Sequence, residues 1–551
     1  MPLSMRRNPA GVLRLIFDSQ YGPRDRFIPR WLFLRALAAI YFSAFYSLLF
    51  QIRGLNGPDG VLPARQYLVA VERSLPALRY WFAPTLLWFS SGNPMLMALC
   101  WIGLAASVAA LLNLWPRLNF LICFVCYLSF VAAAGDFSGY QSDGMLLEAG
   151  FIALFFCPAG LLPGWGAQSP PSRASLFLLQ WEWFRIYFES GMVKLLSGDP
   201  EWRHLTAMDE YYQNGPLPTW VGWYVEHLPH WFHMSTAGAT LALELGLVFL
   251  LFFPRRVRLI CFLIVTPWEI GVILTANYTF LNYLVLTLGI LLLDDGFLHR
   301  FVSGRFRLAV EPLPQEPLAG SEAPISLFNS AEPADELPLE YRKTTHLGAI
   351  RLAVSAVLLT WVGYATTAEL IGIPFPESPL PTAPVRALEP FRIANRYGLF
   401  AVMTRGRYEI EFQGSNDGQT WTPYPFRYKP QALNQAPGIY APYQPRFDWN
   451  LWFASLGDWE QNNLVPLTEE RLLSNSPDVL SLFRGNPFAA APPKYVRAVL
   501  WQYWFTSMKE KHDTGNWWRR QLMGLYAPVL TRQLDGKFGV VQWPEPLPPH
   551  N

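Results

Sequence analysis

Long apolar runs divide the first two thirds of the chain into segments that could cross a membrane. A helix needs about 20 mostly apolar residues to cross the roughly 30 Å of hydrocarbon in a bilayer. A further apolar stretch at 76–90 contains two prolines, and we interpret it as an interfacial or re-entrant segment. The sequence predicts about nine spans, at 31–50, 95–115, 118–134, 145–163, 175–196, 235–253, 257–275, 278–293 and 350–371.

After the last span, long apolar runs give way to alternating apolar and polar residues. Residues 405–430 alternate in this way around Asn416-Asp417-Gly418, which is a strong signal for a β-hairpin turn. Residues 492–506 predict another strand, and residues 468–485 predict short helix. The predicted fold class is therefore an α-helical polytopic membrane domain followed by a soluble, mainly β extramembrane domain that is rich in aromatic residues.

These patterns divide the chain into five regions. They are a cytoplasmic amino-terminal tail (1–30), a transmembrane bundle of about eight spans (31–296), a cytoplasmic linker (297–349), the last transmembrane helix (350–371) and an extracytoplasmic domain (372–551). The linker is rich in Pro and Glu and cannot bury enough apolar surface to fold, so we expect it to be disordered.

Basic residues in the short loops predict the orientation in the membrane, because such residues concentrate on the cytoplasmic side. With nine spans and a cytoplasmic amino terminus, three basic groups fall on that side. They are Arg6, Arg7, Arg14, Arg24, Arg26 and Arg30 in the tail, Arg255, Arg256 and Arg258 in a turn, and Arg300, Arg305, Arg307, Arg342 and Lys343 around the linker. Four arginines in the outer loop 51–94 (Arg53, Arg65, Arg73 and Arg79) count against this orientation.

Composition supports a membrane protein with soluble parts. Of the 551 residues, 52% are hydrophobic and only 15% are charged, whereas soluble domains carry about 25% charged residues. The net charge of +2 is too small to suggest a nucleic-acid partner. All five cysteines (Cys100, Cys123, Cys126, Cys157 and Cys261) lie in predicted spans, so we expect no disulfide in the outer domain.

The span at 175–196 is unusual because it carries several charges, each of which is costly inside a bilayer. Glu182, Arg185 and Glu189 share one helical stripe, and Lys194 lies near the end of the span. Glu244 and Glu269 are the expected partners on other helices. Together with the four residues of this span, they form a predicted polar intramembrane cluster. The cluster either locks helices together or lines an internal cavity. Lys194 either reaches for water at the outer interface or acts in chemistry.

Three other groups of residues are candidate sites. Asp136, Tyr140, Asp143 and Trp202 are candidates for the mouth of an outer cavity. Arg446, Asp448, Trp449 and Trp452 are candidates for docking a client protein, although core packing would also explain the aromatic residues. His227, His230 and His233 have a suggestive spacing, but Pro229 interrupts it and we expect no metal site. The chain contains no nucleophile elbow, P-loop or dinucleotide fingerprint, which disfavours hydrolase, ATPase and dehydrogenase functions.

The run YFESGMVKLLSGDPEW at 187–202 resembles the signature of the lipase maturation factor family. The segments 206–220, 267–284 and 445–457 and the helix with Glu244 fit the same family. The resemblance implies a multipass membrane protein of the endoplasmic reticulum, or of the bacterial inner membrane, that helps a secreted lipase-type client to mature on the extracytoplasmic side. We expect no cofactor and no metal. The expected partners are the lipid bilayer and that client, and the oligomeric state is left open.

A fainter resemblance links Ser190-Gly191, Lys194 and Trp202 to a short segment of the vitamin K-dependent carboxylase. This implies an alternative function, in which an intramembrane enzyme acts on a lipidic or quinone-like substrate with Lys194 or Glu189 as acid–base. A transporter is a third class, but no pair of broken helices in inverted halves is visible. The leading hypothesis is a maturation factor that binds and assembles and does not catalyse.

Overall fold

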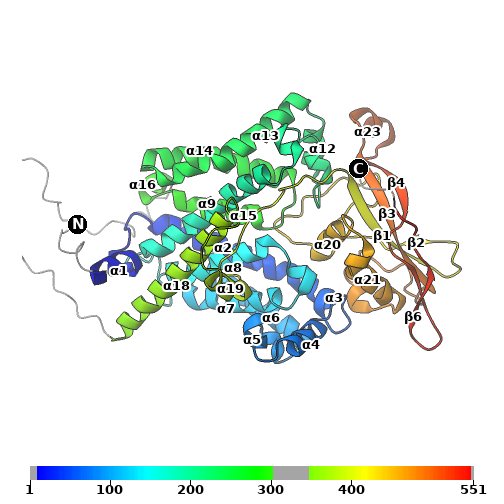
Figure 1. The fold of residues 1–551 in the computed structure, drawn as a ribbon, viewed down its shortest axis with the longest axis horizontal. Coiled ribbons are helices and arrows are strands. Elements are labelled where there is room, and N and C mark those ends of the chain that lie inside the picture. The colour runs from blue at the N-terminus through cyan, green and yellow to red at the C-terminus, as the bar shows by residue number, and fades with distance from the viewer. Residues whose placement is uncertain (1–8, 302–345, 548–551) are drawn as a thin grey trace, which may run out of the picture.

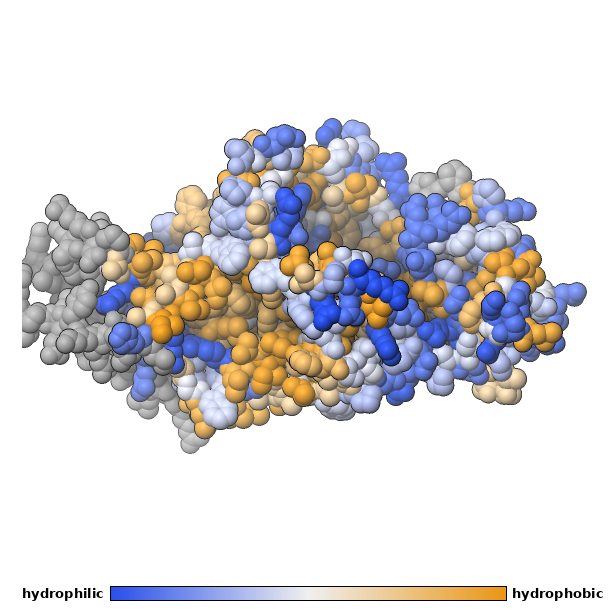
Figure 2. Space-filling view, turned by 60° about the horizontal axis from the view of Figure 1, so that its bottom comes forward, coloured by the Kyte–Doolittle hydropathy of each residue, from blue (hydrophilic) through white to orange (hydrophobic). Residues whose placement is uncertain are grey.

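The computed structural model describes residues 9–301 and 346–547. A helical part and a sheet domain lie at opposite ends of the long axis (Figure 1). On the face seen in Figure 2, apolar surface gathers over the helical part, whereas hydrophilic surface dominates the sheet domain. This division fits a membrane bundle joined to a domain in water.

The nine segments predicted as spans are all helical. They are α2 (Phe27–Leu49), α6 (Asn93–Leu111), α7 (Pro116–Val131), α8 (Gln141–Phe156), α9 (Arg173–Leu196), α13 (His230–Leu245) with η5 (Leu247–Phe252), α14 (Arg255–Thr275), α15 (Leu281–Gly289) with η6 (Ile290–Leu292), and α18 (His346–Gly372). Sequence signals set several of their starts. Prolines stand in the first turns of α6 and α7, and the Ser172 hydroxyl accepts a hydrogen bond from the amide of Ser175 at the start of α9.

The count of nine spans is not confirmed. Among the described residues, five helices are long and apolar enough to cross a membrane, and a sixth is added if 281–292 and 295–301, bent by 98°, form one broken span. The other segments fail for identifiable reasons. Helices α7 and α8 have only 16 residues each, and α9 carries the charged residues described above.

Shorter helices connect these segments and cap both ends of the bundle. They are α1 (Pro9–Phe17), η2 (Ser19–Tyr21), α3 (Ile52–Asn56), α4 (Ala64–Ser74), α5 (Arg79–Phe82), η3 (Leu86–Trp88), η4 (Gly135–Ser138), α10 (Pro200–Arg203), α11 (Tyr211–Asn214), α12 (Trp220–Glu226), α16 (Asp295–Leu298), η7 (His299–Phe301), α19 (Ala383–Leu388) and η8 (Glu389–Phe391). The stretch predicted as interfacial, 76–90, contains α5 and η3. It exposes Tyr80, Trp81, Phe82 and Phe89, and its place at the interface stays a prediction.

Most of the predicted linker lies outside the described residues, which resume at His346. Helices α1 and α16 and the first turns of α18 lie at the end of the bundle away from the sheet (Figure 1). At that end, Asp295 accepts hydrogen bonds from the amides of Phe27 and Ile28, and Arg255 pairs with Asp294 at 2.5 Å. Those residues of the predicted cytoplasmic basic groups that the structure describes therefore lie towards one end of the molecule.

The carboxy-terminal domain contains an antiparallel sheet of β1 (Arg407–Ser415), β2 (Thr422–Pro423), β3 (Tyr495–Phe505), β4 (Trp518–Leu525), β5 (Val529–Arg532) and β6 (Phe538–Gln542). The strand order is β2-β1-β3-β5-β6, and β4 also pairs with β3. The predicted hairpin joins β1 to β2, and Asp417 holds its turn by accepting hydrogen bonds from the amides of Gln419 and Thr420, both at 2.8 Å. The predicted strand at 492–506 corresponds to β3.

Further helices belong to the same domain as this sheet. They are α20 (Arg446–Ala454), η9 (Trp459–Gln461), α21 (Leu464–Leu473), α22 (Pro477–Leu480) and α23 (Met508–Thr514). Tyr408, Ile410 and Phe412 of β1 pack with Phe447 and Leu451 of α20 in one core. This core also includes Leu55 of α3 and Phe137 of η4 from the helical part. The two parts therefore share a core instead of being joined only by a tether.

Candidate functional site

Helix α9 directs its charged residues into the bundle. Glu182, Arg185 and Glu189 have 0% exposure and Lys194 has 4%. The stripe predicted from their spacing thus faces protein. The residues do not form one cluster, however, because Arg185 and Lys194 have different partners.

Arg185 pairs with Glu148 of α8, which is itself 1% exposed. Its second terminal nitrogen lies 3.6 Å from a carboxylate oxygen of Glu189 and donates a 2.7 Å hydrogen bond to the carbonyl of Asn395. The predicted ladder is therefore only partly correct. Both carboxylate oxygens of Glu182 lack a hydrogen-bond partner in the described structure, and the main partner of Arg185 comes from the neighbouring helix.

The segment 393–400, which joins the bundle to the sheet domain, is bound by the same carboxylates. The amide of Asn395 donates to Glu148 at 3.0 Å, and the amide of Tyr397 donates to Glu189 at 2.6 Å. The Asn395 side chain also donates to the carbonyl of Gly144 at 3.0 Å. Buried carboxylates of two helices thus hold a peptide that lies more than 200 residues further along the chain.

Lys194 is buried and paired, so the structure contradicts one of the two alternatives for it, that it reaches for water at the outer interface. Its amino group donates to both carboxylate oxygens of Glu244, at 2.5 and 2.7 Å, and to the Ser190 hydroxyl at 2.9 Å. The ring of Trp202 lies 4.9 Å from the same nitrogen. Glu244 is therefore the partner predicted for it. Glu269 is not a partner of either cation.

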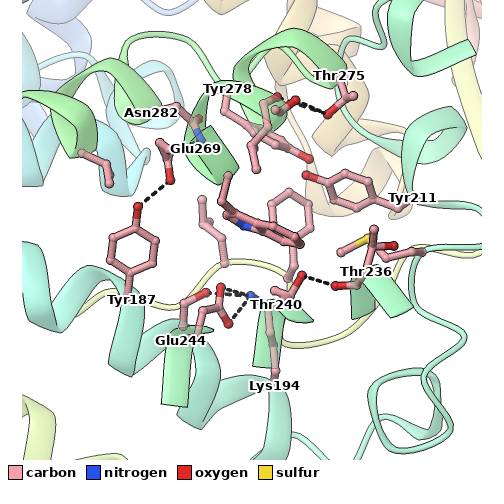
Figure 3. A pocket seen from close by; sticks show the side chains of 18 of the residues that line it. Tyr187, Lys194, Tyr211, Thr236, Thr240, Glu244, Glu269, Thr275, Tyr278 and Asn282 are labelled. Carbon is pink, nitrogen blue, oxygen red and sulfur yellow. Dashed lines mark hydrogen bonds and ion pairs between the residues drawn. The ribbon is translucent and has the colours of Figure 1, made fainter. Parts of the chain in front are cut away.

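Glu269 instead accepts hydrogen bonds from Tyr187 and Asn282, both at 2.6 Å (Figure 3). It lines a cavity of about 320 Å³ together with Tyr187, Lys194 and Glu244. Most of the other lining side chains are apolar or aromatic. Glu189 does not line this cavity, so the two residues predicted as acid–base candidates do not act on a common space. With its charge taken up by Glu244, Lys194 is poorly placed to act as a free base.

The four residues predicted to form the mouth of a cavity lie in different parts of the structure. Only Trp202 lines the cavity, and its indole donates to the carbonyl of Phe400 at 2.8 Å. Asp136 is exposed on the surface. Tyr140 and Asp143 are buried and contact Arg446 and Asn450 of the sheet domain. These two residues form a junction between the domains and do not open onto a cavity.

The four residues predicted to dock a client are all buried. Arg446, Asp448, Trp449 and Trp452 are between 2% and 6% exposed, so they cannot form a docking surface in this structure. Arg446 binds Asp143 through two nitrogens, at 2.7 and 2.8 Å. Asp448 accepts hydrogen bonds from the amides of Tyr428 and Lys429, at 3.2 and 3.1 Å. These four side chains stabilise the core, and Arg446 also joins the sheet domain to the bundle.

Asp448 makes the domain sensitive to pH. Burial raises the pKa of Asp448 from 3.8 to about 6, so between those values the folded chain binds more protons than the unfolded chain. Stability is therefore lost as the pH rises through this window, by about 2–3 kcal/mol in total. We expect Asp448→Asn, which keeps an oxygen acceptor for the two amides, to remove this loss.

The measurement is the unfolding temperature of the full-length protein at pH 4.5 and pH 7.5. The wild type should lose more stability between these two values than the variant does. An equal loss in both proteins would contradict the assignment.

The three histidines do not meet. His227 bonds to the carbonyls of Trp223 and Thr506, His230 to Asp209, and His233 to the carbonyl of Leu228. Across residues 9–301 and 346–547, no group of three or more His, Cys, Asp or Glu is arranged to hold a metal ion. All five cysteines are free and buried.

Two polar residues that hold the parts together were not predicted. The side chain of Asn277 donates to the carbonyls of Leu217 and Gly438, at 3.0 and 2.9 Å, and accepts from the amide of Tyr440 at 2.7 Å. Arg407, which is 0% exposed, donates to the carbonyl of Gln213 at 3.0 Å. A polar residue between two apolar helices was the only sequence signal for Asn277, and nothing in the pattern identified Arg407.

Comparison with known proteins gives consistent matches. A family model for the lipase maturation factor transmembrane domain matches residues 28–300, and one for the lipase maturation factor C-terminal domain matches residues 393–528. Lipase maturation factor 2 of Gallus gallus is 33% identical over 586 residues, which cover 91% of this chain and 81% of that protein. Lipase maturation factor 1 of Bos taurus is 31% identical over 541 residues, covering 95% and 92%.

Lipase maturation factor 1 of Homo sapiens is 30% identical over 567 residues, covering 99% of this chain and 95% of that protein. No solved structure matches the chain significantly. The two family models cover both the helical part and the sheet domain, and the relatives extend over nearly the whole length. This chain, an integral membrane protein, belongs to the lipase maturation factor family.

Proposed function

We propose that this protein assists the maturation of a secreted lipase-type client, with the sheet domain acting on the extracytoplasmic side of the membrane. The supporting observation is the similarity to lipase maturation factors 1 and 2 across both parts of the chain. A maturation factor of this kind would bind its client on a stable surface while it remains anchored in the membrane. The shared core between bundle and sheet domain suits that task.

The proposed orientation rests on the distribution of charge. Helix α16 lies at the end of the bundle away from the sheet domain (Figure 1), and Arg255 pairs with Asp294 directly before this helix, as expected for the cytoplasmic side. Two outer arginines that count against this orientation are neutralised by partners. Arg53 pairs with Asp478 of the sheet domain, and Arg79 pairs with Glu72. They contribute little net positive charge to the outer side.

We assign the contact with the client to the edge strand β6. Strand β6 ends the sheet order, so one side of its backbone has no neighbouring strand within the described residues. Its side chains Val540 and Val541 and the following Trp543 are 41%, 56% and 62% exposed. An exposed apolar edge offers both backbone hydrogen bonds and apolar contact to an extended segment of another chain.

The test is secretion of a lipase from cells that lack their own maturation factor. Co-expression of this protein should raise lipase activity per mass of secreted lipase. Val541→Asp should lower that gain because a charge on the edge strand disfavours pairing with another chain. The matched control is Met508→Asp at the first position of α23, where the side chain is 47% exposed and an acidic residue suits the helix terminus.

The outcomes separate the two claims. If the full-length protein leaves lipase activity per mass unchanged, the proposed function is wrong. If the protein raises it but Val541→Asp is as effective as Met508→Asp, the function stands and the assignment to β6 is wrong.

A further inference from the structure

The cavity beside Lys194 has no part in the proposed contact with the client. It lies between α9, α13, α14 and α15 and is also lined by Tyr397, Leu399 and Phe400 of the segment that joins the bundle to the sheet domain. Its volume, about 320 Å³, is at the lower end of the range of roughly 300–1,000 Å³ seen for small-molecule sites. We propose that this cavity binds one uncharged single-chain lipid, whose head carries hydroxyl or ester groups, as a monoacylglycerol does.

The cavity reaches the surface that lipid would cover. Pro267 and Gly271 of α14 line it and are exposed. Only 17% of the most apolar part of α14 and 33% of that of α13 with η5 is buried, against 61% for α2. These two helices therefore present the most open apolar surface in this part of the bundle, and a ligand would enter from the bilayer. A Cβ atom added at Gly271 would meet no atom within 4 Å, so there is space at this entrance.

Exposed aromatic residues indicate the level of the lipid head. Trp220 and Tyr224 of α12 and Trp231 of α13 are 46%, 44% and 66% exposed, and tryptophan and tyrosine gather where hydrocarbon meets headgroups. Val225 and Phe232, beside them in the sequence, line the cavity. The cavity thus extends inward from that level, which suits a polar head at the interface and an apolar chain between the helices.

The charges inside the cavity favour an uncharged ligand. Lys194 is the only cation among the lining residues of the described structure, and Glu244 already binds it through both oxygens. An anionic head would find no available cation and would face the Glu269 carboxyl group. The groups suited to hydrogen bonding are hydroxyls. Tyr211 and Tyr278 bring theirs close together at the cavity (Figure 3).

This inference does not depend on the proposed function. The experiment uses the full-length protein in vesicles of phosphatidylcholine and a monoacylglycerol that carries a photoactivatable diazirine on its chain. Labelling should be saturable, should be prevented by unlabelled monoacylglycerol, and should map to peptides that contain residues 186–212 or 267–285. A lysophosphatidic acid probe with the same chain should label these peptides roughly tenfold less, which corresponds to about 1.4 kcal/mol of binding free energy.

Gly271→Phe places a ring in the open entrance and should reduce labelling by the monoacylglycerol probe roughly tenfold. The matched control is Gly372→Phe in α18, where an added Cβ also meets no atom within 4 Å but the residue does not line this cavity. Val272→Trp, on the same wall of the cavity, is a second variant in case Gly271→Phe does not fold. Equal labelling of the wild type and both cavity variants would overturn the proposal, as would equal labelling by the anionic probe.

Discussion

Replacing Arg446 with methionine should weaken the junction between bundle and sheet domain by about 3–5 kcal/mol, the usual cost of leaving a buried charge unpaired. Arg446 is 2% exposed and its partner Asp143 is 0% exposed. Besides Asp143, Arg446 donates to the carbonyl of Phe137 at 2.5 Å and to the Tyr127 hydroxyl at 2.9 Å. The substitution would leave Asp143 with only the hydrogen bond from Tyr127, at 2.6 Å.

The matched control is Arg53→Met. Arg53 also joins the two parts, through Asp478 at 2.5 Å, but its side chain is 52% exposed. Such exposed pairs contribute only about 0–1 kcal/mol. The measurements are the unfolding temperature of the full-length protein in detergent and the rate at which protease separates the two domains. We expect a large effect for Arg446→Met, a small one for Arg53→Met, and partial recovery in the double variant Arg446→Met with Asp143→Leu. Equal effects of the two single variants would contradict this account.

Replacing Arg185 with methionine should release the segment 393–400 from the bundle. Glu148 and Glu189 would lose their shared cation, and both would remain buried beside Glu182. We expect a loss of about 3–5 kcal/mol in the local stability of this region. The readout is hydrogen exchange at the amides of Asn395 and Tyr397, which should accelerate by roughly a hundredfold or more.

Glu182→Gln is the control for this variant, because Glu182 lies one turn earlier on α9 with the same burial and makes no hydrogen bond within the described structure. Removing a carboxylate from the vicinity of Glu148 should leave exchange at Asn395 and Tyr397 unchanged or slower. If Glu182→Gln accelerated exchange as much as Arg185→Met, Arg185 would not be what holds the segment.

The elements of this fold were largely predictable, because long apolar runs and strict alternation are local signals. The helices at the nine predicted segments and the strands at 405–430 and 492–506 follow directly from them. The inward stripe on α9 was predictable for the same reason, since Glu182, Arg185 and Glu189 share one face whatever surrounds the helix.

The partners of those residues were harder to predict because they depend on how distant elements pack. Glu148 was not predicted as a partner of Arg185, yet it binds Arg185 from the adjacent helix. Arg446 and Asp448 are charged, and charged residues usually lie on the surface. Only the contacts of Arg446 with Asp143, and of Asp448 with the backbone at 428–429, show that both belong to the interior. A sequence shows that a charge needs a partner but does not show which one.

The hold of Glu148 and Glu189 on the peptide around Asn395 has a consequence for biosynthesis. Both carboxylates belong to α8 and α9, which leave the ribosome long before residues 393–400 do. Until then they lack two of the amides that they bind in the finished protein. The membrane part is thus completed by its own carboxy-terminal region. A chain that stops after α18 would lack these two contacts, so we expect its helical part to be less stable than the same part of the full-length protein.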